Sequence, residues 1–324
     1  MSLSVAIATY NRAPMVIEAV EAALAQSRAP EEIIVSDDAS TDETAARIES
    51  LAEGDRRVRL IRQTRNSGGV RNWNAAMAAT RGELIAWCSD DDRFLAGHLE
   101  SSAAYLETHP EIGLVHSGFV DSIETKEGRH LEPRPLRPVS ILTKDHLLRY
   151  LIRHYDWPFH PSTMVMRRSV WEQVGPFDPG YHFSDTEWFL RVVAKFPVAY
   201  LARQGVLNRR HPGNWSNRLG SAHLQRELFE VVDGMICREY TGWGRRLRRE
   251  LWRAHVRTRL ALTLRARLQS GHGEAARAVW HGLLQQTGLA TPVWIERAGG
   301  VIIHALSAGR ERRFRDPGQS VSPL

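Results

Sequence analysis

Hydrophobic and polar residues alternate along residues 1–90 in a pattern that predicts strands and helices in turn. Short apolar runs, typical of buried strands, are separated by segments with apolar residues three or four positions apart, which are typical of helices. The predicted strands are residues 3–9, 32–36, 58–61 and 84–88, and the helices between them end near residues 26, 52 and 80. This alternation, with short connections, indicates a parallel α/β sheet with helices on both faces.

The pattern becomes less regular after residue 97. We predict helices over residues 98–108, 143–154 and 185–195, strands over residues 112–120, 162–166 and 199–201, and an irregular loop over the proline-containing residues 121–140. From residue 223 onward only helices are predicted. We therefore expect one domain over residues 1–220 and a helical region over residues 221–324.

Composition and charge place the chain among ordinary globular proteins, with 43% hydrophobic and 25% charged residues. Its two cysteines form no disulfide framework and suit a reducing cytosol, and no signal peptide or membrane-spanning run is apparent. We therefore expect a cytoplasmic protein.

The net charge of +6 is concentrated at one end. Residues 221–324 carry 17 arginines, no lysine and nine acidic residues, a net charge of +8, which leaves −2 on residues 1–220. In this basic region Leu247, Leu251 and Ala254 fall near one helical face, with arginines on the flanks. Such a helix packs its apolar face on the protein, or docks peripherally on the anionic inner face of a membrane.

The most prominent polar feature is the triplet Asp90-Asp91-Asp92, which directly follows the apolar run of residues 84–88. A buried strand that ends in carboxylates delivers them to the sheet edge at which open α/β sheets bind ligands. Three adjacent carboxylates need a counter-charge, and Mg²⁺ or Mn²⁺ shared with a diphosphate supplies it. The alternative is a solvated acidic turn.

Other polar residues follow predicted strands or begin predicted helices. Asp38 either accepts a hydrogen bond from a base or caps the next helix, and Arg71 begins a helix after a Gly-Gly pair, where anions are attracted. Asp185 is either a helix cap, together with Ser184, or a general base. His211, in the predicted polar loop of residues 209–216, is either a surface residue or a metal ligand.

Together these motifs resemble those of family 2 glycosyltransferases, which have the GT-A fold, over residues 3–216. Enzymes of this family move a sugar from a nucleotide sugar to an acceptor hydroxyl with inversion. The resemblance implies a Rossmann-like nucleotide-sugar half over residues 1–110, an acceptor half over residues 111–220 and a C-terminal α-helical extension. The matching segments are Ser4–Arg12, Ile33–Asp42, Asn66–Asn72, Ser89–Asp92, Val170–Asp178 and Ser184–Arg191.

The resemblance also implies roles for individual residues. Asp185 matches the catalytic base, Asp91 matches the ligand of a Mn²⁺ or Mg²⁺ cofactor, and His211 matches a histidine near that metal. The donor, with UDP or dTDP favoured, is expected to contact Thr9, Tyr10, Asn11, Arg12, Asp38, Gly69, Arg71 and Asp90. The acceptor is expected to be a saccharide or a lipid-linked saccharide in polysaccharide or glycoconjugate biosynthesis, and no nucleic-acid partner is expected.

Three positions depart from the family pattern. Ser89 replaces the first aspartate of the usual Asp-x-Asp motif, which leaves the number of protein ligands to the metal open. Ser184 stands where glutamate commonly precedes the base, and Ala39 stands where glycine is usual. Both of these changes look tolerable from the sequence.

Two other functions compete with sugar transfer. A metal-dependent nucleotidyltransferase would be expected to carry a glycine-rich triphosphate loop after the first strand, whereas residues 10–14 contain no glycine. A non-catalytic adaptor would use the basic region to bind nucleic acid or membrane and would bind no nucleotide sugar.

Overall fold

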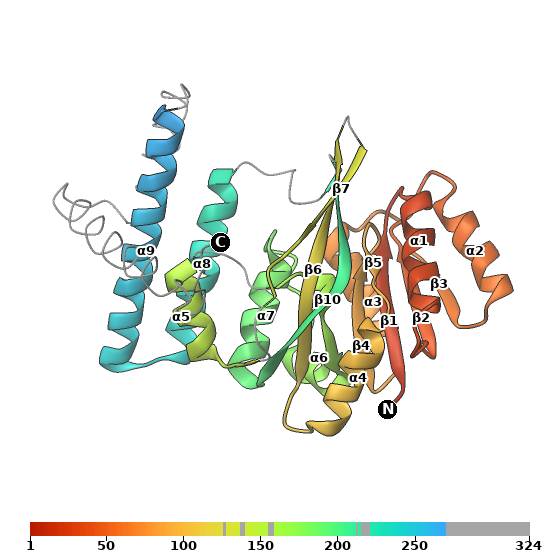
Figure 1. Ribbon diagram of the computed structural model, residues 1–324, viewed down its shortest axis with the longest axis horizontal. Helices are drawn as coiled ribbons and strands as arrows, with labels where there is room; N and C mark the ends of the chain where they lie inside the picture. The colour runs from red at the N-terminus through yellow and green to blue at the C-terminus, as the bar shows by residue number, and fades with distance from the viewer. Residues whose placement is uncertain (126–127, 137–139, 155–158, 212, 215–220, 270–324) are drawn as a thin grey trace, which may run out of the picture. The chain divides into compact units, whose positions relative to one another are not determined.

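The computed structural model describes residues 1–125, 128–136, 140–154, 159–211, 213–214 and 221–269. The chain divides into two compact units, one made of Met1–Leu151 and Asp156–Gly220 and the other of Ser221–Leu324 with residues 152–155. The elements, most of which are labelled in Figure 1, are β1 (Leu3–Thr9), α1 (Ala13–Leu24), β2 (Glu32–Asp37), α2 (Thr44–Gly54), β3 (Val58–Arg62), α3 (Gly69–Ala79), β4 (Leu84–Ser89), β5 (Arg93–Phe94), α4 (His98–Thr108), β6 (Leu114–Thr125), β7 (Gly128–Pro133), β8 (Ser140–Leu142), α5 (Lys144–His154), β9 (Val165–Arg167), α6 (Arg168–Val174), α7 (Ser184–Lys195), β10 (Val198–Arg210), α8 (Ser221–Glu239) and α9 (Gly242–Gln269).

One mixed sheet forms the centre of the first unit, with the strand order β3-β2-β1-β4-β9-β6-β10-β5. β3, β2, β1 and β4 run parallel, β9 runs antiparallel to both β4 and β6, and β10 runs parallel to β6. The predicted α/β sheet is confirmed. The first four strands and the helices between them lie within a few residues of their predicted bounds. β1, β2 and β4 are buried along most of their length, whereas β3, at the edge of the sheet, buries only Val58.

The parallel register places the carboxyl ends of β2, β1 and β4 next to one another. Ala8 of β1 is level with Ser36 of β2 and with Ser89 of β4. The polar residues that follow these three strands therefore meet at one edge of the sheet, as the sequence predicts.

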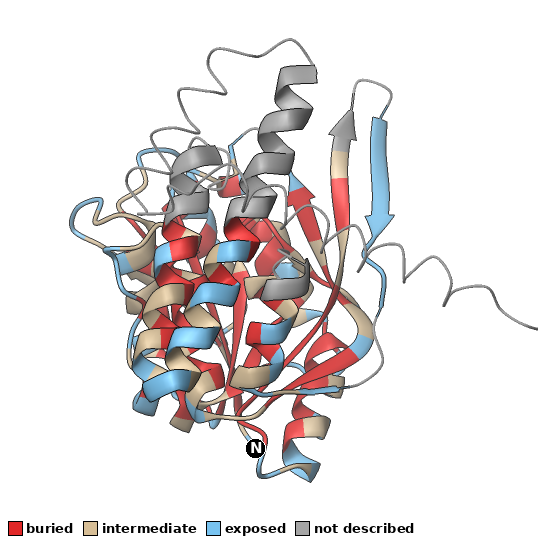
Figure 2. Cartoon of the chain, turned by 90° about the vertical axis from the view of Figure 1, so that its left-hand side faces the viewer, coloured by how far each residue is buried: buried red, intermediate tan, exposed pale blue. Residues whose placement is uncertain are grey.

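Helices cover both faces of this sheet. α1, α2 and α4 pack on one face, where Val16, Ile48 and Leu99 join the apolar side chains of the strands. On the other face Trp87 of β4 contacts Trp73 of α3, with 4.3 Å between ring centroids. Figure 2 shows that the strands are buried along most of their length, whereas the helices are buried mainly on one side. The first unit is thus a three-layer α/β/α sandwich.

The second half of the sheet differs from the prediction. Within residues 121–140, predicted as a loop, residues 121–125 extend β6, residues 128–133 form β7 and Ser140 begins β8. β10 runs to Arg210 instead of ending near residue 201. The predicted strand over residues 162–166 is a 3₁₀ turn, Pro161–Thr163, followed by β9, and β5 is not predicted. β7 is exposed throughout, so its polar residues and terminal proline carry no apolar strand signal.

In the second unit α8 and α9 pack against each other. The indole N–H of Trp252 donates to the Phe229 carbonyl at 3.3 Å, and the Arg249 guanidinium binds both oxygens of Asp233 at 2.8 Å. Leu247 and Leu251, on the apolar face for which the sequence leaves packing on the protein and docking on a membrane open, are 40% and 47% exposed. The packing alternative is not met in this part of α9, where the buried side chain is Trp252, on a different face. No helix in the described part of the chain is long and apolar enough to cross a membrane.

Candidate active site

The aspartate triplet at the end of β4 forms the centre of the candidate site. Asp90, Asp91 and Asp92 are only 6%, 8% and 1% exposed, so the triplet is no solvated turn. The Thr9 hydroxyl donates to Asp90 Oδ2 at 2.8 Å, and the Ser162 hydroxyl donates to Asp92 Oδ2 at 2.5 Å. Each outer carboxylate is therefore held by a neighbouring segment of the sheet.

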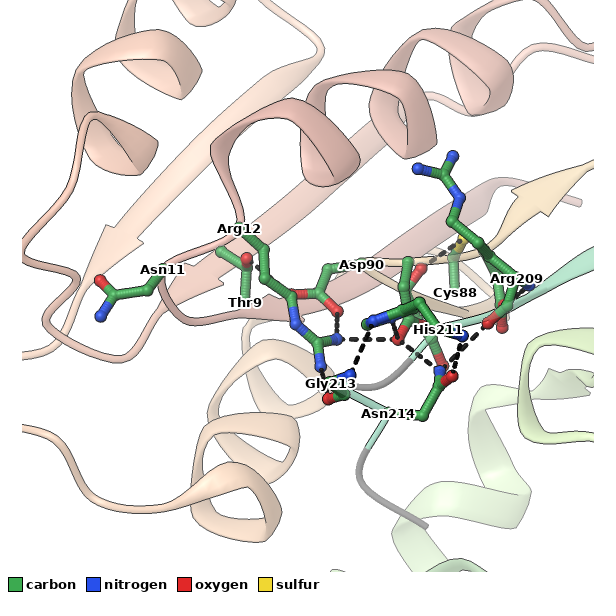
Figure 3. A network of polar contacts seen from close by, with 12 residues as sticks. Thr9, Asn11, Arg12, Cys88, Asp90, Arg209, His211, Gly213 and Asn214 are labelled. Atoms are coloured by element: carbon green, nitrogen blue, oxygen red, sulfur yellow. Dashed lines mark hydrogen bonds and ion pairs between the residues drawn. The ribbon is translucent and has the colours of Figure 1, made fainter. Parts of the chain in front are cut away.

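Arg12 supplies the triplet with an internal counter-charge. Its Nη1 lies 2.8 Å from Asp90 Oδ1 and 2.8 Å from Asp91 Oδ2, while Nη2 donates to the Gly213 carbonyl at 2.6 Å. Figure 3 shows this side chain extending from the start of α1 to the carboxylates. The counter-charge that the sequence analysis assigns to a metal is thus provided in part by the protein.

Burial and charge repulsion control protonation of the triplet. Burial raises the pKa of Asp90 despite the opposing charge of Arg12, and burial with repulsion from Asp91 raises the pKa of Asp92 well above its usual range. Burial likewise raises the pKa of the Cys88 thiol. The protein therefore holds less negative charge here than three exposed aspartates would.

His211 is brought to Asp91 from a distant part of the sequence. Its Nε2 lies 3.1 Å from Asp91 Oδ2, and Asn214 Nδ2 lies 3.2 Å from the same oxygen. The Asn214 side-chain oxygen accepts the His211 backbone N–H at 2.6 Å, which fixes the turn after β10. Because Arg209 still belongs to β10, the predicted polar loop begins two residues later than expected.

The donor set at this corner is one carboxylate and one imidazole. Within the described residues no three Asp, Glu, His or Cys side chains form a group that could hold a metal. The Ser89 hydroxyl oxygen lies 3.1 Å from that of Ser162, and Ser89 contributes no carboxylate. A divalent cation held by Asp91 and His211 would therefore need its remaining oxygen ligands from a bound group such as a diphosphate.

Asp38 holds the loop that precedes α3. Its Oδ1 accepts the Ser67 N–H and hydroxyl, both at 2.8 Å, and its Oδ2 accepts the Gly68 N–H at 2.9 Å. A carboxylate offers about four acceptor positions, so one remains that can accept an N–H group of a nucleobase. The helix-cap alternative for Asp38 is wrong, since α2 begins only at Thr44 and has no side-chain cap.

The other predicted donor-binding residues lie around the same edge. Tyr10 is 41% exposed, Gly69 is the first residue of α3, and Arg71 is exposed on its first turn. Asn11 Oδ1 accepts the Thr41 N–H at 2.8 Å, and in Figure 3 its side chain points away from the carboxylates. Asn11 thus braces the β1–α1 loop against the β2–α2 loop.

Asp185 lies on the first turn of α7. The helix begins at Ser184 with Phe183 as its N-cap and without a side-chain cap, so the prediction that Ser184 or Asp185 caps it is wrong. Asp185 Oδ1 accepts the Thr186 N–H at 2.7 Å.

Aromatic contacts connect α7 to the strand that carries the aspartates. Trp188, one turn after Asp185, is fully buried and contacts Phe177 with 5.1 Å between ring centroids. Phe177 contacts Trp87 at 4.6 Å, and Trp87 lies three residues before Asp90. This chain of rings holds the helix of Asp185 against the core below the site.

His160 and Ser162 also reach the aspartate triplet, although neither is among the site residues predicted from the sequence. His160 Nδ1 lies 3.6 Å from Asp92 Oδ2, and burial lowers the pKa of His160 to about 4. His160 belongs to no motif or periodic pattern, and Ser162 is only the first residue of the strand predicted over residues 162–166. They reach the site only because β9, which follows them, is inserted between β4 and β6.

A helix-covered mixed sheet with carboxylates at its carboxyl edge defines a GT-A type of transferase. The chain belongs to glycosyl transferase family 2, whose sequence profile matches residues 4–175. An uncharacterized glycosyltransferase of Bacillus subtilis (strain 168), YwdF, is 31% identical over 200 residues, which cover 61% of this chain and 70% of that protein.

Solved structures share the fold. S. aureus TarS (residues 1–349) in complex with UDP-GlcNAc aligns with a TM-score of 0.68 and 15% identity over 99% of this chain and 95% of that one. The mannosyltransferase PcManGT of Pyrobaculum calidifontis, in complex with GDP-Man and Mn²⁺, aligns with a TM-score of 0.51 and 16% identity over 97% and 81%. The predicted GT-A fold and glycosyltransferase class are confirmed, and the nucleotidyltransferase and adaptor alternatives find no support.

Proposed function

We propose that the protein is an inverting glycosyltransferase that moves a sugar from UDP-sugar or dTDP-sugar to an acceptor hydroxyl in polysaccharide or glycoconjugate biosynthesis. The observation that carries the proposal is the meeting of Asp38, Asp90, Asp91 and His211 along one sheet edge. TarS, which shares the fold, forms a complex with UDP-GlcNAc, which favours a uridine donor over the GDP-Man of PcManGT.

In this proposal the donor lies along the carboxyl ends of β2, β1 and β4. The remaining acceptor position of Asp38 binds an imide N–H of the base, and Tyr10 packs over the ring. Thr9 and Arg12 orient Asp90 toward the donor. Gly69 and Arg71, at the start of α3, add a helix N-terminus and a positive charge for the phosphates.

The transfer itself is a single displacement. Asp91 and His211 would hold Mn²⁺ or Mg²⁺, which when bound neutralises the charge that develops on the leaving diphosphate. Asp185 takes the proton from the acceptor hydroxyl as that oxygen attacks the anomeric carbon. Attack opposite the leaving group inverts the anomeric centre, and one base suffices because no covalent sugar intermediate forms.

Thermal protection by nucleotides tests the donor assignment. UDP or dTDP with Mn²⁺ should raise the melting temperature more than GDP, and Arg71→Ala should reduce that rise. Arg47→Ala is the matched control, because Arg47 is exposed on α2 and, among the described residues, pairs only with Glu43 of the same helix. Stronger protection by GDP would contradict a pyrimidine donor, and a product that keeps the donor's anomeric configuration by NMR would contradict inversion.

We further propose that α9 contacts an anionic membrane surface. Trp243, Leu247 and Leu251, spaced four residues apart, are 76%, 40% and 47% exposed, and Arg246 and Arg248 flank them. An exposed apolar stripe between arginines suits the interface of anionic lipids.

Liposome sedimentation tests this contact with the full chain. Binding to vesicles that contain phosphatidylglycerol should exceed binding to phosphatidylcholine vesicles, should weaken in high salt and should fall in Trp243→Ser. Leu131→Ser, which changes a 52% exposed residue of β7, is the control and should bind like the wild type. Equal binding by Trp243→Ser and the wild type would exclude this stripe.

A further inference from the structure

Two arginines from separate strands converge on one buried carboxylate beside the aspartate triplet. Arg134, just after β7, donates from Nε to Asp121 Oδ2 at 2.8 Å, and Arg210, the last residue of β10, donates from Nε to Asp121 Oδ1 at 2.9 Å. The Asn208 amide also donates to Asp121 Oδ1, at 2.6 Å. Asp121 is thereby fixed at the ends of β6 and β10.

The cluster carries an excess of positive charge. The Asp121 side chain is 4% exposed, and although burial opposes its ionisation, Arg210 and Arg134 lower its pKa below the usual value. One negative charge therefore faces two guanidinium groups. Only the Nε atoms bind Asp121, and among the described residues no other hydrogen bond or ion pair engages these two guanidinium groups.

Both arginines remain open to a ligand. Their side chains are 51% and 44% exposed, although Arg134 also lies over the Phe119 ring at 5.5 Å. Paired guanidinium groups with free terminal N–H donors are well suited to phosphate oxygens, which they bind with two parallel hydrogen bonds.

The cluster adjoins the catalytic edge on the side away from the proposed nucleoside site. Arg210 directly precedes His211, and the His160 ring lies 5.2 Å from Phe119 while its Nδ1 lies 3.6 Å from Asp92 Oδ2. In the sheet, β6 and β10 lie on one side of β4, whereas β1 and β2, which carry the proposed nucleoside-binding residues, lie on the other. A group bound here is therefore positioned to belong to the acceptor.

We infer that Arg134 and Arg210 form an anion subsite that binds a phosphate group of the acceptor. The inference rests on the proposed function, since it takes the donor to occupy the β1–β2 side of the edge. The site selects acceptors that carry a phosphate close to the hydroxyl that is glycosylated. The diphosphate of the donor has the same chemistry, so the experiment must separate the two sources.

Isothermal titration of the full chain with inorganic phosphate, in the presence of saturating UDP, makes that separation. With the donor site filled, phosphate should bind the wild type, and Arg134→Gln and Arg210→Gln should each weaken it roughly tenfold or more, as expected for loss of charge-assisted hydrogen bonds. Arg47→Gln, with a side chain 43% exposed against 44% for Arg210, should leave phosphate binding unchanged. UDP affinity should be unchanged in all three variants.

Other results of these titrations would contradict either the anion subsite or the proposed donor. Phosphate affinities that are equal in the wild type and both variants would overturn the subsite. A loss of UDP affinity in Arg134→Gln with phosphate binding retained would assign the arginine to the donor and also overturn it. Failure of the wild type to bind UDP would instead count against the proposed donor, and the same phosphate titration without UDP would still test the two arginines.

Discussion

Replacing Arg12 by glutamine should destabilise the first unit strongly, because it leaves Asp90 and Asp91 without their counter-charge. Counted for the side chains alone, Asp90 and Asp91 are 8% and 11% exposed, and Arg12 is 21% exposed. Removing one partner of a buried ion pair costs about 3–5 kcal/mol. The partial exposure of Arg12 and the raised pKa of Asp90, which lets that carboxyl take up a proton, reduce our expectation to about 2–3 kcal/mol.

Urea unfolding followed by tryptophan fluorescence, without metal or nucleotide, measures this loss. For a domain of this size the expected loss lowers the melting temperature by roughly 4–12 °C. Arg62→Gln is the control, because Arg62 is 60% exposed and pairs with the 49% exposed Glu49 at 3.3 Å. A surface pair of this kind contributes less than about 1 kcal/mol.

A second substitution tests the electrostatic cause. Asp90→Asn in the Arg12→Gln background removes one of the two repelling charges and should restore part of the lost stability, while the Thr9 hydroxyl keeps a partner in the amide. If Arg12→Gln lowers stability no more than Arg62→Gln does, Arg12 is not the counter-ion of the triplet. If Asp90→Asn restores nothing, the loss comes from packing and not from charge.

Three further predictions concern the base, the metal and a strained residue. Asp185→Asn should keep UDP binding and lose turnover by roughly 10²–10⁴-fold, whereas Glu187→Gln, which breaks a 2.9 Å pair with Arg191, should lower stability and leave the turnover of the folded enzyme nearly unchanged; the reverse pattern would move the base. Asp91→Ala and EDTA should each abolish transfer, and full activity in EDTA would remove the metal from the mechanism. Ala39→Gly should raise the free energy of unfolding by about 1 kcal/mol, because Ala39 has a φ of +60° that glycine adopts without strain, and no gain in urea unfolding would contradict this.

The conformation of Ala39 gives a physical reason for the glycine that is usual at this position in the family. A glycine is usual there, and the backbone has a left-handed φ that explains the preference. The alanine is accommodated, but at a conformational cost that composition and periodicity do not reveal.

The sequence by itself determined the first half of the fold. The strands predicted over residues 3–9, 32–36, 58–61 and 84–88 form with at most one further residue at the end of each, because each apolar run is short and is bounded by turn residues. It also placed Asp38 and Asp90 at a common edge, since parallel strands align their carboxyl ends. These inferences succeed because local periodicity and strand direction are properties of short segments.

The tertiary structure alone decided which side chains meet. His211 reaches Asp91 across 120 positions, and Ser162 reaches Asp92 across 70 positions, because β9, β6 and β10 follow β4 in the sheet in an order that no local pattern encodes. Arg12 could be assigned to the donor from its motif, but its pairing with the aspartates depends on the pairing of β1, which precedes Arg12, with β4.

The sequence is equally unable to show which strands and helix faces lie on the surface. β7 lies on an exposed edge, where a strand has no apolar face to bury, so its residues read as a loop. α9 has apolar residues on two faces, and the helical period cannot say which of them packs against α8. The helical period shows that a face is apolar. It does not show which segment packs on that face, because this depends on how the whole chain folds.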